Sequence, residues 1–203
     1  VYALFAVGYT DGFVYYHGRY ILRTDNSGQS WINLPLPDSD YATLAWHALT
    51  AGVDPNDPDH VYVGGLDVWK SDDGGLHWSH LSDWALMYYG GGDDYIHADQ
   101  HVSLFKPGSS DEMLYGSDGG VFYTDEATSG NPAFQQMNKS FNSLQFYTCA
   151  ISPVAGENRF IGGLQDNGTL FYDNATLDIN DMIDGGDGAY CFWDKDEPLI
   201  FIT

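Results

Sequence analysis

The chain repeats a pattern of strand, polar turn and strand four times. The four stretches read GVDPNDPDHVYVGG (52–65), LFKPGSSDEMLYGSDGG (104–120), AISPVAGENRFIGGLQDNG (150–168) and FWDKDEPLIFI (192–202). Their turns align on Pro55, Pro107, Pro153 and Lys195. Short strands bounded by turn residues, with no helical periodicity, predict an all-β fold.

The spacing of these turns predicts the architecture. They recur every ~40–50 residues, which is the length of one four-stranded blade of a β-propeller. Small residues stand four positions before each turn, as suits a crowded innermost strand: Ala51, Ser103, Cys149 and Cys191. We therefore predict one incomplete propeller over 1–203. Its full blades are expected at 46–82, 100–140 and 144–182, with partial blades at 1–35 and 186–203. The chain starts at Val1 within a strand-like stretch, so the remaining blades are expected in other parts of a longer parent protein.

Two further stretches, TDNSGQSW (24–31) and SDDGGLHW (71–78), share a spacing of polar, glycine and tryptophan residues. The pattern resembles the Asp-box, or bacterial neuraminidase repeat, although Asn26 stands where the pattern has Asp. We expect a structural turn in which the hydroxyl and carboxylate bind loop amides, the glycine takes a positive φ and the tryptophan packs between sheets. The positions concerned are Thr24, Asn26, Gly28, Trp31, Ser71, Asp73, Gly75 and Trp78.

The charge of the chain excludes some partners. It carries 29 acidic and 7 basic side chains, a formal net charge of −22. Such a surface repels nucleic-acid backbones and anionic membranes, so we expect no nucleic-acid partner. No apolar run approaches the ~18 residues that a membrane span requires, so we expect no membrane insertion. An acidic surface of this kind is compatible with neutral sugars, cations or basic proteins as partners. It is also compatible with an extracellular location.

Several acidic residues are expected at one end of the blades. In a four-stranded meander, the turn between the second and third strands and the links between blades lie at the same end, opposite the Asp-box turns. Asp118, Asp166 and Asp187 belong to these segments. They are candidates for the carboxylate pair of a glycoside hydrolase. Gly-Asp turns are also common in β-proteins without such a role.

The segment HADQH places His97, Asp99 and His101 at alternate positions. On an extended strand these side chains would point to one side, where they could hold a divalent metal ion. The alternative is that the histidines form hydrogen bonds to neighbouring blades. A divalent cation is the one cofactor that the sequence suggests.

The link before HADQH is long and aromatic. It contains Trp84, Tyr88, Tyr89 and Tyr95 beside three glycines. These rings are candidates for a platform on which a sugar stacks, or alternatively for a lid packed on the end of the blades.

The order HADQH, GSDGGVF, LQFY, GGLQDNGT and GGDG over about 95–190 is similar to that of sortilin-like, Asp-box propellers of secreted bacterial proteins. Members of that group are often labelled glycosyl hydrolases. The resemblance implies an extracellular or cell-surface propeller, but it implies no particular reaction.

Two functions are compatible with these residues. The first is a scaffold that binds a neutral glycan or a cell-surface protein. The alternative is a glycoside hydrolase of the xyloglucanase type, which would use the acidic residues on a neutral polysaccharide. A sialidase is disfavoured, because it needs three converging arginines and the chain has only Arg19, Arg23 and Arg159, two of them expected at the wrong end.

Overall fold

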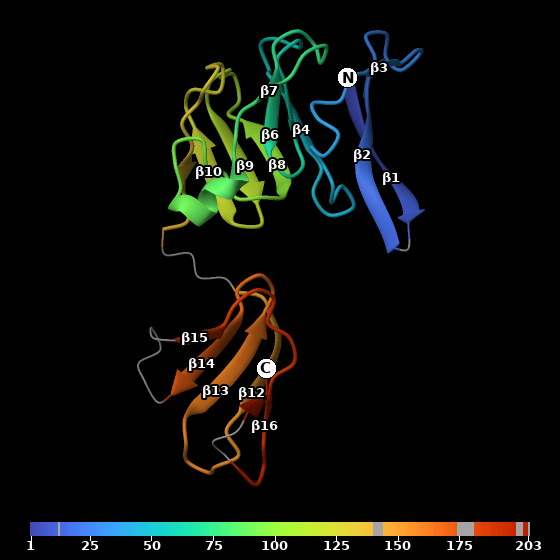
Figure 1. Ribbon diagram of the computed structural model, residues 1–203. Coiled ribbons are helices and arrows are strands. Elements are labelled where there is room, and N and C mark those ends of the chain that lie inside the picture. Colours follow the sequence, from blue (N-terminus) through green and yellow to red (C-terminus); the bar gives the residue numbers. More distant parts are fainter. Residues whose placement is uncertain (12, 140–143, 174–180, 198–200, 203) are drawn as a thin grey trace. The chain divides into compact units, whose positions relative to one another are not determined.

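The computed structural model describes residues 1–11, 13–139, 144–173, 181–197 and 201–202. These residues belong to two compact units, Val1–Lys139 (unit 1) and Ser140–Thr203 (unit 2), which are described separately. Both units are built from antiparallel sheets (Figure 1). Among the described residues, no helix is long and apolar enough to cross a membrane.

Unit 1 contains three sheets in which each strand pairs with the next strand of the chain. The first sheet comprises β1 (Tyr2–Asp11), β2 (Phe13–Arg23) and β3 (Ile32–Leu34). The second comprises β4 (Thr50–Val53), β5 (Val61–Gly64), β6 (Val68–Ser71) and β7 (Ser79–His80). The third comprises β8 (Gln100–Phe105), β9 (Met113–Ser117), β10 (Gly120–Thr124) and β11 (Gln135–Gln136). A 3-10 helix, η1 (Trp84–Tyr89), lies between β7 and β8.

Unit 2 follows the same strand order. A four-stranded sheet comprises β12 (Phe146–Ile151), β13 (Arg159–Leu164), β14 (Thr169–Asp173) and β15 (Asp181–Asp184). A two-stranded sheet of β16 (Phe192–Trp193) and β17 (Phe201–Ile202) comes next. The predicted all-β class is confirmed, and the repeated antiparallel meanders are blades of an incomplete propeller.

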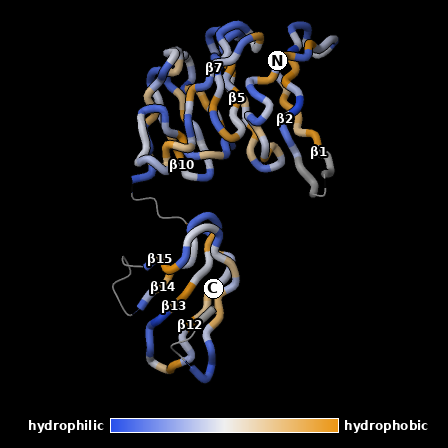
Figure 2. The backbone as a smooth tube through the Cα atoms, viewed as in Figure 1, coloured by the Kyte–Doolittle hydropathy of each residue, from blue (hydrophilic) through white to orange (hydrophobic). Residues whose placement is uncertain are grey.

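Two apolar cores in unit 1 lie between neighbouring sheets. Because successive side chains of a strand point to opposite faces, β5 supplies both cores. Tyr62 joins the core shared with the third sheet, while Val61 and Val63 join the core shared with the first. All three residues are fully buried. Figure 2 shows hydrophobic residues in the strands of unit 1, including β5 and β10, and hydrophilic turns around them.

The first strands of the second and third sheets, β4 and β8, pack beside each other. Small residues allow this approach: a Cβ added at Gly52 would lie 3.3 Å from the Cβ of Ser103. In unit 2 the two cysteines are free, Cys191 being buried and Cys149 exposed on β12.

The turn 71–78 has the hydrogen bonds expected from its sequence. The Gly75 N–H donates to Ser71 Oγ at 2.8 Å, and the N–H groups of Leu76 and His77 donate to Asp73 Oδ1 at 3.0 and 2.9 Å. Gly75 takes a φ of 93°. The hydrogen bond from the His77 ring strongly lowers the pKa of Asp73. The side chains therefore act on their own turn.

The turn 24–31 is built in the same way, with Asn26 in place of Asp. The Gly28 N–H donates to Thr24 Oγ1 and the Ser30 N–H donates to Asn26 Oδ1, both at 2.9 Å. Gly28 takes a φ of 85°. An amide oxygen thus replaces the carboxylate as the acceptor.

The two tryptophans of these turns differ in burial. Trp78 packs against the core between the first and second sheets, and its Nε1–H donates to the Pro35 carbonyl oxygen at 3.0 Å. Trp31 is exposed, contrary to the expected packing between sheets. Trp78 is covered by residues of the first sheet, whereas Trp31 lies just before β3, at the edge of that same sheet.

Candidate functional site

The loops at one end of unit 1 are joined by backbone hydrogen bonds. The Leu66 N–H donates to Tyr41 O, the Asp99 N–H to Leu66 O and the Asp118 N–H to Asp99 O, at 2.8–3.2 Å. We call this surface the loop end; it comprises 41–47, 65–67, 83–101 and 117–120. It lies opposite the turns 24–31 and 71–78, and η1 marks it at the lower edge of unit 1 in Figure 1. Within unit 1, the links between sheets and the turns between second and third strands therefore lie at one end, and the turns 24–31 and 71–78 lie at the other, as expected.

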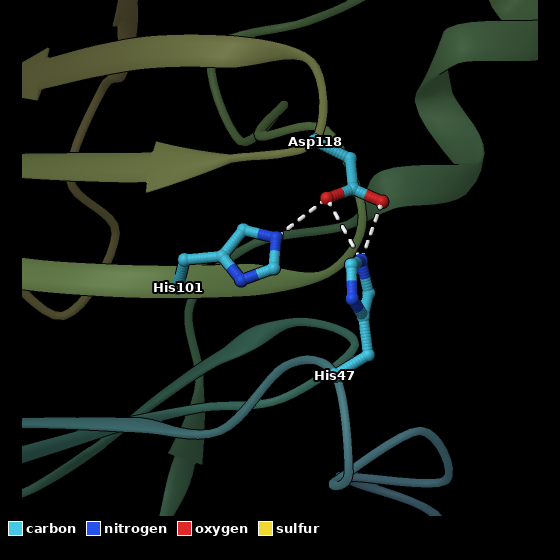
Figure 3. Close-up of side chains that lie close together, drawn as sticks. All are labelled: His47, His101 and Asp118. Carbon is cyan, nitrogen blue, oxygen red and sulfur yellow. Dashed lines mark hydrogen bonds and ion pairs between the residues drawn. The ribbon is translucent and has the colours of Figure 1, made fainter. Parts of the chain in front are cut away.

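Three chemically reactive side chains meet at the loop end (Figure 3). His47 comes from the link before β4, His101 from β8 and Asp118 from the turn between β9 and β10. His101 Nε2 lies 2.5 Å from Asp118 Oδ1, and His47 Nε2 lies 3.2 Å from both carboxylate oxygens. The imidazole rings meet edge to face with centroids 4.7 Å apart. The side chains are 36%, 34% and 28% exposed, so solvent reaches all three.

A second carboxylate, that of Asp99, lies close to this cluster. Burial raises the pKa of Asp99, and the negative charge of Asp118 raises it further. Its buried Oδ1 has no hydrogen-bond partner among the described residues. Burial also acts to raise the pKa of Asp118, but hydrogen bonds from His101 and His47 outweigh that effect and lower it. The site therefore holds two carboxylates in opposite electrostatic environments.

The expected alternation of His97, Asp99 and His101 along an extended strand is wrong. Strand β8 begins only at Gln100, and Asp99 adopts a left-handed conformation with a φ of 64°. His97 Nδ1 lies 3.1 Å from the Ala98 carbonyl oxygen, and its ring packs against Gly119. Of these three residues, only His101 belongs to the group that could hold a metal ion, and its partners there are His47 and Asp118.

Asp67 connects the second sheet to the aromatic link. Its buried carboxylate accepts hydrogen bonds from Ser82 Oγ and from the Trp84 N–H, both at 2.9 Å. Its Oδ2 lies 3.1 Å from His80 Nε2, and this hydrogen bond raises the pKa of His80 despite partial burial. The His80 ring stacks on Trp69 with centroids 4.4 Å apart. Asp67 therefore anchors the start of η1.

The aromatic residues of the link fall into two classes. Tyr88 and Tyr89 are 70% and 82% exposed, and the ring of Trp84 meets that of Tyr88 at 5.9 Å. Tyr95 instead packs against Phe122 and the adjoining core, so its ring stabilises the fold. Of the four rings predicted to form a platform for a sugar, only the three in η1 remain candidates: Trp84, Tyr88 and Tyr89.

Trp46 and His47 are functional candidates that the sequence analysis missed. Trp46 is 65% exposed, and its ring lies 5.3 Å from that of His47. The two residues occupy a link without a repeat motif, and the signal that could have marked them is an adjacent Trp-His pair in a connection between strands.

The other two acidic candidates lie together in unit 2. The Asp166 N–H donates to Asp187 Oδ1 at 2.8 Å, and Asp166 has a φ of 55°. In this arrangement the Asp187 carboxylate holds the turn between β13 and β14. Asp118 belongs to unit 1, and the catalytic role of all three acids stays a prediction.

The sequence matches no known protein family and no curated protein. Among solved structures, the chain is similar to the GH74 xyloglucanase from Xanthomonas campestris, with 15% identity and a TM-score of 0.47 over 77% of this chain and 25% of that one. It is also similar to an ancestral GH74 enzyme, with 16% identity and a TM-score of 0.41 over 83% of this chain and 22% of that one. YCF48 from Cyanidioschyzon merolae has 11% identity and a TM-score of 0.30 over 89% of this chain and 73% of that one. The chain thus spans about a quarter of the length of the two GH74 structures.

Proposed function

We propose that the chain is part of an extracellular Asp-box propeller that acts as a scaffold for binding a neutral glycan. The loop end of unit 1 is the proposed binding surface. Three exposed rings carry the proposal: Trp46, Tyr88 and Tyr89 are 65%, 70% and 82% exposed. Exposed aromatic side chains that gather on one surface are typical of interaction sites.

The neighbouring polar groups suit sugar hydroxyls. Asp118 offers carboxylate oxygens, and His47 and His101 offer ring nitrogens that donate or accept according to tautomer. Rings would stack on the apolar face of a sugar while these groups bind its hydroxyls. The net charge of −22 opposes binding of sialic or uronic acids, which favours neutral glycans.

The described residues form three four-stranded sheets, whereas propellers typically have about 4–8 blades. We therefore propose in addition that further blades, together with this chain, complete the propeller. A basic or neutral cell-surface protein is the competing partner.

An array of neutral and acidic oligosaccharides tests the proposal. We expect binding to neutral glycans only, weakened about 10–100-fold in a Trp46→Ala/Tyr88→Ala double variant, as loss of ~1–3 kcal/mol of ring contacts implies. Trp31→Ala is the matched control, because it removes an exposed ring at the opposite end of unit 1.

Three outcomes would contradict the proposal. Binding confined to acidic glycans would contradict the electrostatic argument, and binding to no glycan would favour a protein partner. Release of reducing sugar from a neutral β-glucan, lost in Asp118→Asn, would replace the scaffold by a glycoside hydrolase.

A further inference from the structure

We infer that His47, His101 and Asp118 bind one divalent transition-metal ion of the Zn²⁺ class, with at least one coordination position open to solvent. The ligand atoms of these three residues lie within 4.8 Å of one another. The same three side chains are those proposed above to bind sugar hydroxyls, but this inference concerns the ion alone and is tested without a glycan.

The orientation of the side chains supports the inference. Both imidazoles direct Nε2 at the same carboxylate, at 2.5 Å for His101 and 3.2 Å for His47. A ring N–H at each Nε2 would donate these hydrogen bonds to the carboxylate. An ion placed among the three groups would replace those hydrogen bonds by coordination bonds of ~2.0–2.2 Å.

The nature of the donors selects the class of ion. Two imidazole nitrogens and one carboxylate suit Zn²⁺ and related transition metals. Ca²⁺ instead takes 6–8 oxygen ligands, and Mg²⁺ prefers an octahedral shell of oxygens. A site with three protein ligands leaves a position for water or an external ligand, and all three side chains are partly exposed.

Asp99 provides a second, independent reason for a cation here. Its buried Oδ1 lacks a hydrogen-bond partner among the described residues, and Asp99 stands two positions before His101 in the chain. Two neighbouring carboxylates repel each other, and a bound cation would offset that repulsion. Asp99 is not one of the three ligands, and we assign it to the surroundings of the ion.

The ion would also connect separate parts of unit 1. His47 precedes the second sheet, whereas His101 and Asp118 belong to the third (Figure 3). An ion that binds only the folded chain stabilises it according to the ratio of free ion to Kd. Metal binding should therefore raise the thermal stability of unit 1.

Isothermal titration calorimetry and thermal unfolding of the 203-residue chain, after dialysis against EDTA, test the inference. We expect one Zn²⁺ per chain and a higher Tm with Zn²⁺, but no rise with Ca²⁺ or Mg²⁺. His47→Gln, His101→Gln and Asp118→Asn should each weaken Zn²⁺ binding by more than the 10–100-fold typical of losing an outer-shell partner.

Two control variants separate this site from other histidines. His97→Gln tests the neighbouring ring that lies outside the cluster, and His77→Gln tests an exposed histidine that contacts Asp73 at 2.6 Å in the turn 71–78. Both should bind Zn²⁺ as the unsubstituted chain does. Circular dichroism of every variant establishes that it is folded. Absence of Zn²⁺ binding by the unsubstituted chain, or undiminished binding by a folded His47→Gln/His101→Gln double variant, would overturn the inference.

Discussion

Gly75 is constrained by both its backbone conformation and its surroundings. Its φ is 93°, and a Cβ there would lie 2.6 Å from Leu34 Cδ1, in the core between the first and second sheets. Gly28, the equivalent residue of the turn 24–31, has a φ of 85° but open surroundings, the nearest atom being 3.9 Å away in Trp31. Substitution of Gly28 therefore tests backbone strain alone, whereas substitution of Gly75 tests backbone strain and steric conflict together.

We expect Gly28→Ala to lower the free energy of unfolding by about 1–2 kcal/mol, the cost of a left-handed conformation in an L-residue. Gly75→Ala should cost ~1–3 kcal/mol more, because the added methyl also displaces Leu34. Urea unfolding of both variants measures the difference. Equal losses would show that Leu34 moves aside freely and that packing adds nothing at Gly75.

At the scale of elements, the contact between His80 of β7 and Asp67 links the edge of the second sheet to the start of η1. The hydrogen bond to Asp67 raises the pKa of His80, and the charges of Asp67, Asp83 and Asp38 act in the same direction. Protonated His80 therefore favours the folded chain. This contribution is complete below the ordinary histidine pKa of ~6.5 and is lost as the pH rises through the raised pKa of the folded state.

Thermal unfolding between pH 5 and 9 checks this contribution. The Tm difference between the unsubstituted chain and His80→Gln should be largest below pH 6 and should shrink as the solution becomes alkaline. Comparing the two chains at each pH cancels the titration of the other groups. A difference that stayed constant with pH would mean that neutral His80 stabilises the edge equally well, through its stacking on Trp69.

The elements that the sequence predicts well are those defined by neighbouring residues. The turn 71–78 carries its own hydroxyl, carboxylate and glycine, so eight consecutive residues determine its hydrogen bonds. Helix η1 has comparable local signals, since Asp83 caps its start and Gly90 takes the left-handed conformation at its end. Its six residues are too few for a helical period, and the sequence therefore indicated only a long link.

The site depends on contacts between sheets and is for that reason less predictable. His47 and Asp118 are separated by 71 positions, and nothing in the link 35–49 indicates which turn it will reach. The conformation of Asp99 has a similar origin, because its N–H binds Leu66 in the turn of the preceding sheet. That contact ends the extended segment before β8 and separates His97 from His101.

For the whole molecule, charge is the property with the broadest consequence. Acidic residues outnumber basic ones by 29 to 7. Among the described residues, at least five of the seven basic side chains form ion pairs with acids, namely Arg23, Lys70, Lys106, Arg159 and Lys195. The excess carboxylates therefore repel one another over the surface, and this repulsion opposes the compact state.

Added salt should consequently stabilise this chain. Raising ionic strength from about 10 to 150 mM shortens the screening length from ~30 to ~8 Å, which weakens repulsion between distant carboxylates more than attraction within ion pairs. We expect a gain on the order of 1 kcal/mol, or a Tm increase of ~2–4 °C for a chain of this length. Thermal unfolding in EDTA, with sodium chloride and with tetramethylammonium chloride at matched ionic strength, measures the effect and separates general screening from sodium binding. A Tm that falls with both salts would mean that the ion pairs contribute more to stability than the repulsion removes, since both interactions are screened by the same ions.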